Sequence, residues 1–350
     1  QKMHLVAVSD SAHSILVIDD RTGRKVKTLN AESGSRSIAI DAEGKVLAGV
    51  GEDGMVRLWD LSSGRLRWEH DNILNTSGIT FDTSGTRLGA WQTSWPGRVV
   101  IWDVASGRAS LDTKMSFRKQ SPGLSYISEI DPEAAKFSPD GKFLLIAVDN
   151  VSALDLDTGN ILFDLEAKDV RQIGFNHAGT LVATAEFNGT VRLWDVKTGH
   201  ERFSFSGHHF PLSSLSFSQD DRLLLATSVD GSARILDSVS GREISQLWGH
   251  RNGILTGTFN PQGDRVVTAS MDGTARIWDT KTGENVGYIA NSNSAMLFCS
   301  YTENADRIIT VSADGTVAIH AAGIKELLEL AEKELTNVMT VRPSGHNLVR

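Results

Sequence analysis

The chain has 350 residues, 40% of them hydrophobic and 22% charged, a balance typical of a folded globular protein. No apolar run approaches the roughly 18 residues that a membrane-spanning helix needs, so we expect no membrane insertion. A net charge of -8 without a basic stripe argues against a nucleic-acid partner. The single cysteine, Cys299, rules out an internal disulfide and favours a cytoplasmic location.

One strand-like segment recurs along the chain and predicts a repeat protein. Each copy follows a tight turn, and the turn residues Asn188, Asp230, Asp272 and Asp314 are each 42 residues apart. Apolar alternation that is cut by Gly and Asp predicts antiparallel strands joined by hairpins. In chain order the eight copies are 14–20, 55–60, 98–103, 151–156, 190–195, 232–237, 274–279 and 316–321.

The two ends of the repeat array are incomplete. The first copy has no innermost strand before it, and the last copy has no outermost strand after it. Residues 323–336 instead place apolar side chains at helical spacing, which predicts one C-terminal amphipathic helix. Residues 337–350 read like a first strand and the turn after it. We expect this tail to supply the missing inner strand of the first repeat, which would remove an exposed sheet edge.

Two dipeptides recur in phase with the repeat. Trp-Asp occurs as Trp59-Asp60, Trp102-Asp103, Trp194-Asp195 and Trp278-Asp279, and Gly-His occurs as Gly207-His208 and Gly249-His250. In these motifs and in its period the chain resembles the WD-repeat β-propeller family over residues 1–322. The resemblance implies an all-β propeller of four-stranded antiparallel blades that stack on one another. Eight copies favour eight blades over seven. In the seven-bladed alternative, residues 25–29 would complete the last blade.

A His, a Ser and an Asp recur together near the Trp, which raises the possibility of a hydrolase triad. The resemblance instead implies a buried hydrogen-bonded tetrad that rigidifies each blade, and its decay from blade to blade favours this structural role. The sixth repeat has Leu236 where the tetrad would have Trp. The expected tetrad residues are His250, Ser270, Asp272 and Trp278 in the seventh repeat, and His208, Ser228 and Asp230 in the sixth.

Two insertions interrupt the regular spacing, at 91–97 and 111–133. The resemblance places both on one face of the propeller, on neighbouring blades. Aromatic and basic side chains on loops are typical of binding hot spots, although such loops also fold back onto their own rim. The expected partner-binding residues are Trp91, Trp95, Phe117, Arg118, Lys119, Tyr126, Phe210 and Trp248.

The sequence therefore predicts a non-catalytic module for a protein or peptide partner, a scaffold or sensor domain. Because the chain begins with Gln1, we expect it to be part of a larger multidomain protein. The alternative is a propeller enzyme with a cofactor or metal in its central funnel, since residues 153–164 are similar to quinone-cofactor dehydrogenases. The predicted inner strands carry mostly Ser, Thr and apolar residues, so we expect no catalytic residue, cofactor or metal. The oligomeric state stays open.

Overall fold

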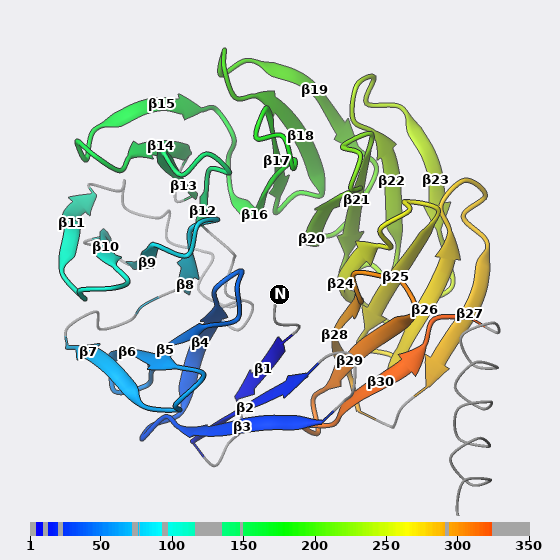
Figure 1. The fold of residues 1–350 in the computed structure, drawn as a ribbon. Helices are drawn as coiled ribbons and strands as arrows, with labels where there is room; N and C mark the ends of the chain where they lie inside the picture. The colour runs from blue at the N-terminus through cyan, green and yellow to red at the C-terminus, as the bar shows by residue number, and fades with distance from the viewer. Residues whose placement is uncertain are drawn as a thin grey trace, which may run out of the picture.

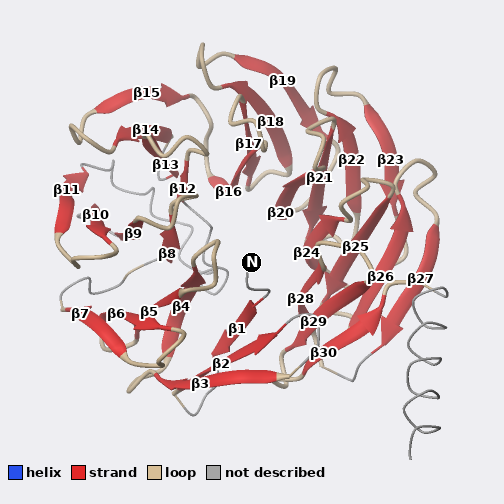
Figure 2. Cartoon of the chain, viewed as in Figure 1, coloured by secondary structure: helices blue, strands red, loops and turns tan. Residues whose placement is uncertain are grey.

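The computed structural model describes residues 5–9, 13–19, 24–71, 76, 78–92, 97–115, 135–147, 150–290 and 294–323. All regular elements in these ranges are strands, and they form eight antiparallel sheets in a ring (Figures 1 and 2). The predicted eight-bladed all-β propeller is confirmed. No helix within the described ranges is long and apolar enough to cross a membrane.

Six blades have four strands, and the first strand of each lies nearest the centre of the ring (Figure 1). The second blade has β4 (Ser35–Ile40), β5 (Val46–Gly51), β6 (Val56–Asp60) and β7 (Leu66–His70), and the third has β8 (Gly78–Phe81), β9 (Arg87–Gln92), β10 (Gly97–Asp103) and β11 (Ala109–Met115). The fourth has β12 (Ala135–Phe137), β13 (Phe143–Ala147), β14 (Val151–Asp155) and β15 (Ile161–Leu165), and the fifth has β16 (Val170–Phe175), β17 (Leu181–Glu186), β18 (Thr190–Asp195) and β19 (Glu201–Ser206). The sixth has β20 (Leu212–Phe217), β21 (Leu223–Ser228), β22 (Ala233–Asp237) and β23 (Glu243–Leu247), and the seventh has β24 (Ile254–Phe259), β25 (Arg265–Ser270), β26 (Thr274–Asp279) and β27 (Asn285–Ala290).

The first and last sheets each have three strands among the described residues. Within the described ranges the first sheet has no inner strand and the last has no outer one, as the sequence predicts. Because β3 pairs with β2 inside the first sheet, it does not complete the last blade, and the seven-bladed alternative is wrong. The strands are β1 (Leu5–Ser9), β2 (Ser14–Asp19) and β3 (Lys25–Asn30), then β28 (Met296–Tyr301), β29 (Arg307–Ser312) and β30 (Val317–Ala321).

The tail strand predicted at 337–350 and all but the first residue of the helix predicted at 323–336 lie outside the described residues. Both therefore stay predictions. No described strand pairs with the inner edge of β1 in the first sheet.

The apolar core lies between neighbouring blades. One cluster joins Leu58 of the second blade to Leu88 and Trp102 of the third, and all three side chains are buried. Another joins Val267 of the seventh blade to Met296 of the eighth. A single four-stranded sheet leaves both faces in water, so each blade gains its stability from the blades beside it.

The Asp of the Trp-Asp motif shapes the turn between the third and fourth strands. Asp279 Oδ1 accepts hydrogen bonds from the N–H and the hydroxyl of Thr282, at 3.0 and 3.2 Å. In the fifth blade, hydrogen bonds from Arg202 and from Thr198 lower the pKa of Asp195 to about 2. A carboxylate at this position is thus ionised and satisfied by the turn that it closes.

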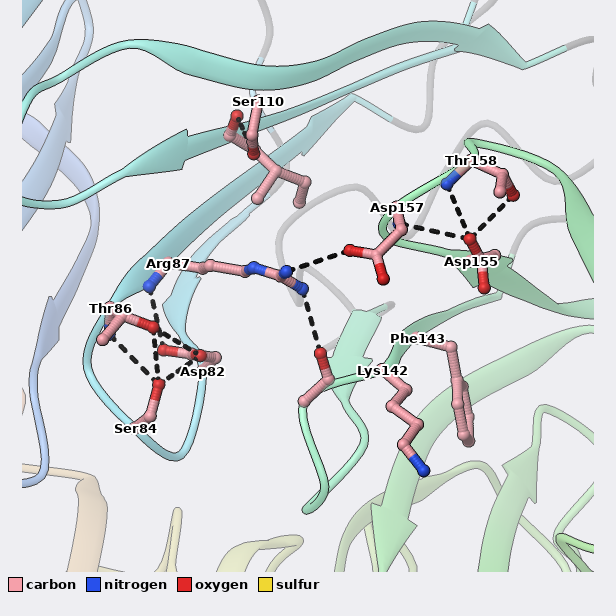
Figure 3. A network of polar contacts seen from close by, with 12 residues as sticks. Asp82, Ser84, Thr86, Arg87, Ser110, Lys142, Phe143, Asp155, Asp157 and Thr158 are labelled. Atoms are coloured by element: carbon pink, nitrogen blue, oxygen red, sulfur yellow. Dashed lines mark hydrogen bonds and ion pairs between the residues drawn. The ribbon is translucent and has the colours of Figure 1, made fainter.

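On the side of the ring that carries the turns between third and fourth strands, polar contacts join the third blade to the fourth (Figure 3). The Arg87 guanidinium donates to Gly141 O at 3.0 Å and to Asp157 Oδ1 at 3.1 Å. The backbone of Arg87 is held by Asp82 Oδ1, and Asp82 Oδ2 also accepts from Ser84 Oγ. These contacts join blades that the chain connects only through the long segment between β11 and β12.

The seventh blade contains a buried chain of four polar side chains. Trp278 Nε1 donates to Thr268 Oγ1 at 2.8 Å, and that hydroxyl lies 2.8 Å from His250 Nε2. His250 Nδ1 lies 2.9 Å from Asp272 Oδ2. Burial lowers the pKa of His250, and Asp272 does not offset it. A neutral imidazole with its proton on Nδ1 completes the chain, because Thr268 then donates to Nε2 and accepts from Trp278.

This geometry corrects the predicted tetrad, because Thr268 takes the place that the sequence analysis gave to Ser270. Ser270 Oγ lies 3.0 and 2.9 Å from the carbonyl oxygens of Asn252 and Gly253 and accepts from Asp272 N–H. Both ring nitrogens of His250 have other partners, Asp272 and Thr268. Ser270, His250 and Asp272 therefore do not form a nucleophilic triad.

The sixth blade has only part of this hydrogen-bonded chain. Ala226 and Leu236 stand at the positions of Thr268 and Trp278. His208 Nε2 is consequently buried without a hydrogen-bond partner among the described residues. An unpaired buried nitrogen costs stability, so this blade is held less firmly than the seventh.

Of the residues predicted for the tetrad of the sixth blade, His208 and Asp230 lie together, whereas Ser228 has other partners. His208 Nδ1 lies 3.1 Å from Ser232 Oγ and 3.4 Å from Asp230 Oδ2. Ser228 Oγ instead bonds Pro211 O at 3.0 Å. Ser228 therefore anchors the chain segment before β20, as Ser270 anchors the one before β24.

We predict that the hydroxyl of Thr268 is the centre of the tetrad. Thr268→Val keeps the shape but leaves His250 Nε2 and the Trp278 indole N–H unpaired, which should lower the free energy of unfolding by about 2–4 kcal/mol. Thr268→Ser keeps the hydroxyl and should cost about 1 kcal/mol for the lost methyl group. Chemical denaturation measures both, and equal losses in the two variants would contradict the assignment.

A pH dependence follows from the buried imidazole. The unfolded chain protonates this His near its ordinary pKa of 6.5, whereas the folded chain keeps it neutral to lower pH. The free energy of unfolding should therefore fall as the pH drops below about 6.5. Melting temperatures of the parent and of His250→Gln between pH 7.5 and 5.0 test this. The variant should melt lower at pH 7.5 and lose less on acidification, and parallel curves would refute it.

The ring closure predicted for residues 337–350 can be tested by deletion. Removing this segment should lower the melting temperature or cause aggregation if it covers the inner edge of the first sheet. Addition of the 337–350 peptide should then restore part of the loss. A shortened chain that stays monomeric and melts like the parent would show that the tail does not close the ring.

Candidate interaction face

One side of the ring carries two kinds of connection, and we call it the link face. It holds the links from the outer strand of one blade to the inner strand of the next, and the turns between second and third strands. A backbone hydrogen bond joins turn to link wherever both partners are described. These bonds are Glu52 N–H to Gly34 O, Phe187 N–H to Asp169 O, Val229 N–H to Pro211 O, Met271 N–H to Gly253 O and Ala313 N–H to Ala295 O.

Both predicted insertions branch from this face by connectivity, at the β9–β10 turn and at the link between β11 and β12. Most of their residues, 93–96 and 116–133, lie outside the described residues. The role of this group in binding stays a prediction. Its members are Trp95, Phe117, Arg118, Lys119 and Tyr126.

Trp91 is a correction to the predicted binding set. It lies on β9, opposite Val99 and Gly78, and only 4% of its surface is exposed. Its ring packs in the core between the third and fourth blades with Phe137. Gly78 leaves the space, because a Cβ there would lie 2.3 Å from Trp91 Cζ2. The strand runs further into the insertion than the sequence spacing suggests, so Trp91 is not available to a partner.

Two predicted aromatics are exposed on links. Phe210 precedes β20 and is 58% exposed, and Trp248 precedes β24 and is 62% exposed. Sequence reasoning missed Met271, which is 41% exposed in the β25–β26 turn. Its position beside the Asp-Gly turn could have predicted this exposure. The link face thus presents large apolar side chains from at least two neighbouring blades.

The link face also contains a cavity of about 650 Å³ between the fourth and fifth blades. Arg192 pairs there with Glu186 at 2.7 Å and with Glu201 at 2.6 Å, and these carboxylates raise the pKa of Arg192. Sequence reasoning missed this cavity, because it depends on how two blades meet. Its lining residues are Asn150, Glu166, Lys168, Asp169, Glu186, Asn188 and Arg192.

Two observations bear on catalysis and metal binding. Within the described residues no group of three His, Cys, Asp or Glu side chains is arranged to hold a metal ion. Cys299 is buried on β28 in the core beside the seventh blade, and burial raises the pKa of its thiol. A thiol in this setting packs as a small apolar residue.

Two family models match the chain. The one described as WD domain, G-beta repeat matches residues 199–237 and 241–279. The one described as outer membrane protein assembly factor BamB matches residues 3–205, more than half of the chain.

Three curated relatives are similar over about half of the chain. The WD repeat-containing protein SL1-17 of Schistosoma mansoni is 28% identical over 51% of this chain and 56% of its own length. The apoptotic protease-activating factor 1 of Rattus norvegicus is 25% identical over 56% of this chain and 15% of its length. The autophagy-related protein 16 of Arabidopsis thaliana is 25% identical over 54% and 35%. The chain thus matches about half, or less, of each relative.

Solved structures share the fold at low identity. The C-terminal WD40 domain of Sif2 has a TM-score of 0.75 and 16% identity, covering 91% of this chain and 93% of that domain. The computationally designed protein Ika8 has a TM-score of 0.76 and 20% identity, covering 92% and 94%. With the repeat motifs and the eight blades in place, the chain belongs to the WD-repeat β-propellers, and by its match over residues 3–205 also to the family described as BamB.

Proposed function

We propose that this chain is a non-catalytic module that binds a protein or peptide on its link face. WD-repeat propellers generally serve as protein-interaction scaffolds. The observation that carries the proposal is the exposure of Phe210 and Trp248 on neighbouring links. Large aromatic side chains supply much of the binding energy of protein interfaces, and keeping them in water is unfavourable without a partner.

The links are rigidly placed, which supports their use in binding. Trp248 stands two residues before His250, and the tetrad holds that His at both ring nitrogens. The Phe210 link also lies close to the fifth-blade turn: a Cβ placed on Gly189 of that turn would be 3.1 Å from Phe210 O. A preorganised surface loses little conformational entropy on binding.

The proposed setting is a larger, cytoplasmic protein. The chain corresponds to only 15% of the apoptotic protease-activating factor and 35% of the autophagy-related protein. We propose that it is likewise a propeller domain next to other domains. The buried single Cys299 and the net charge of -8 support a reducing compartment and a protein partner, not nucleic acid or a membrane.

A second candidate is a propeller enzyme with a quinone-type cofactor in the central funnel. The match of residues 3–205 to the BamB model favours it, because that model carries the designation PQQ_2. Pyrroloquinoline quinone with Ca²⁺ is the direct probe. Saturable binding that raises the melting temperature would favour this candidate over the interaction module.

The interaction face can be tested with a double substitution. Phe210→Ala with Trp248→Ala removes two exposed rings, so the free energy of unfolding should change by no more than about 0.5 kcal/mol per site. Affinity capture from source lysate, followed by mass spectrometry, should lose the partner that the parent retains. A further variant, Trp95→Ala with Arg118→Ala, tests whether the insertions contribute.

The matched control removes exposed apolar side chains away from the link face. Tyr288 on β27 is 68% exposed, and Val239 in the β22–β23 turn is 74% exposed. Tyr288→Ala with Val239→Ala should leave capture unchanged. Loss of the partner in this control, with capture intact in the link-face variants, would move the binding surface to the rim or to the opposite face.

A further inference from the structure

The cavity between the fourth and fifth blades lies beside a short link. Residues 166–169 join β15 to β16, whereas residues 248–253 join β23 to β24, two residues more. The longer link carries His250, which fills the space beside Asp272 in the seventh blade. The short link has no His, and Asn188 stands where Asp272 does.

The fifth blade keeps the rest of the polar chain. Trp194 Nε1 still donates to Thr184 Oγ1 at 3.0 Å, so the blade itself is intact. The difference lies at its surface, where the cavity of about 650 Å³ opens among the exposed side chains of Glu166, Lys168 and Asp169. Its volume is within the range of ligand sites in proteins.

The deepest charged group in the cavity is already balanced. Glu186 is only 2% exposed, and its Oε1 accepts from Arg192 Nε at 2.7 Å. Arg192 also donates to Glu201 at 2.6 Å, and Asn188 Nδ2 lies 3.4 Å from Glu186 Oε2. A buried carboxylate that is paired in this way is not a free ligand, but it cancels the positive charge that Arg192 would offer to an anion.

The groups left for a ligand are at the rim. The side chains of Glu166, Asp169 and Lys168 make no hydrogen bond or ion pair with another side chain in the part of the chain that the structure describes, so the rim carries a net charge of -1. Asp169 has a positive φ of 50°, which holds its backbone in the left-handed region next to the cavity. Asn150 adds an amide from the fourth blade.

We propose that this cavity binds the cationic side chain, arginine or lysine, of a partner peptide. The two rim carboxylates pair with the guanidinium or ammonium group, and the Asn150 amide oxygen accepts a further hydrogen bond. An anion would meet Glu166 and Asp169 at the rim and only Lys168 as an uncompensated cation. The proposal rests on the proposed function and names the chemistry of one contact on the link face.

The test uses the full chain and short probes. N-acetyl-Gly-Arg-Gly-amide and its Lys and Glu counterparts are titrated while the NMR signals of Asp169 and Asn188 are followed. We expect saturable shifts with the Arg and Lys peptides and none with the Glu peptide. The shifts should weaken at high salt, because the rim charges are exposed. Preferential binding of the Glu peptide, or no saturable shift at all, overturns the proposal.

Variants of the rim charges test whether the cavity prefers a cation or an anion. Glu166→Gln and Asp169→Asn should each weaken Arg-peptide binding about fivefold, and Asn tolerates the positive φ as Asp does. Lys168→Gln removes a like charge and should strengthen binding. Glu284→Gln, an exposed change on the opposite face, should have no effect. Weaker binding in Lys168→Gln would contradict a cation site.

This result is separable from the proposed function. If Arg peptides do not bind while Phe210→Ala with Trp248→Ala loses its partner, the interaction face stands and the cavity proposal is wrong. If Arg peptides bind while every link-face variant retains its partners, the cavity is a cation site but the partner is held elsewhere.

Discussion

Each blade of this ring depends on its neighbours to bury the two apolar faces of its sheet. Leu58 and Leu88 come from different blades yet share one core, and Val267 and Met296 do the same at the other end of the chain. Since an isolated blade would leave these side chains in water, each repeat is stable only beside its neighbours. The antiparallel order of the strands in each blade then places every link and turn on one side of the ring or the other.

Hydrogen bonds then tune how firmly each blade holds its link. The seventh blade has the complete chain from Trp278 to Asp272, whereas the sixth lacks the middle hydroxyl and leaves His208 Nε2 unpaired. The fifth retains only the pair of Trp194 and Thr184 and has a cavity beside its shorter link. The propeller thus tolerates loss of these bonds, because packing between blades carries most of its stability.

The strands and the eight blades could be predicted because the period and the strand alternation are properties of local sequence. The tetrad could be predicted only in part: Thr268 and Ser270 lie two residues apart on one strand and share a face, so spacing alone does not show which reaches His250. Trp91 was misplaced because an insertion hides where a strand ends. The cavity combines the link at 166–169, the fifth blade and a turn from the fourth blade, and no single segment reveals such a combination.

The backbone bond between turn and link has a consequence for how such a protein changes. It uses only main-chain atoms, for example Met271 N–H and Gly253 O, and it recurs where the side chains differ. Substitution of those side chains therefore alters what the surface recognises without removing the bond that shapes it. Specificity and folding are encoded in separate atoms, so the same ring can acquire a new partner through surface mutations that leave its stability nearly unchanged.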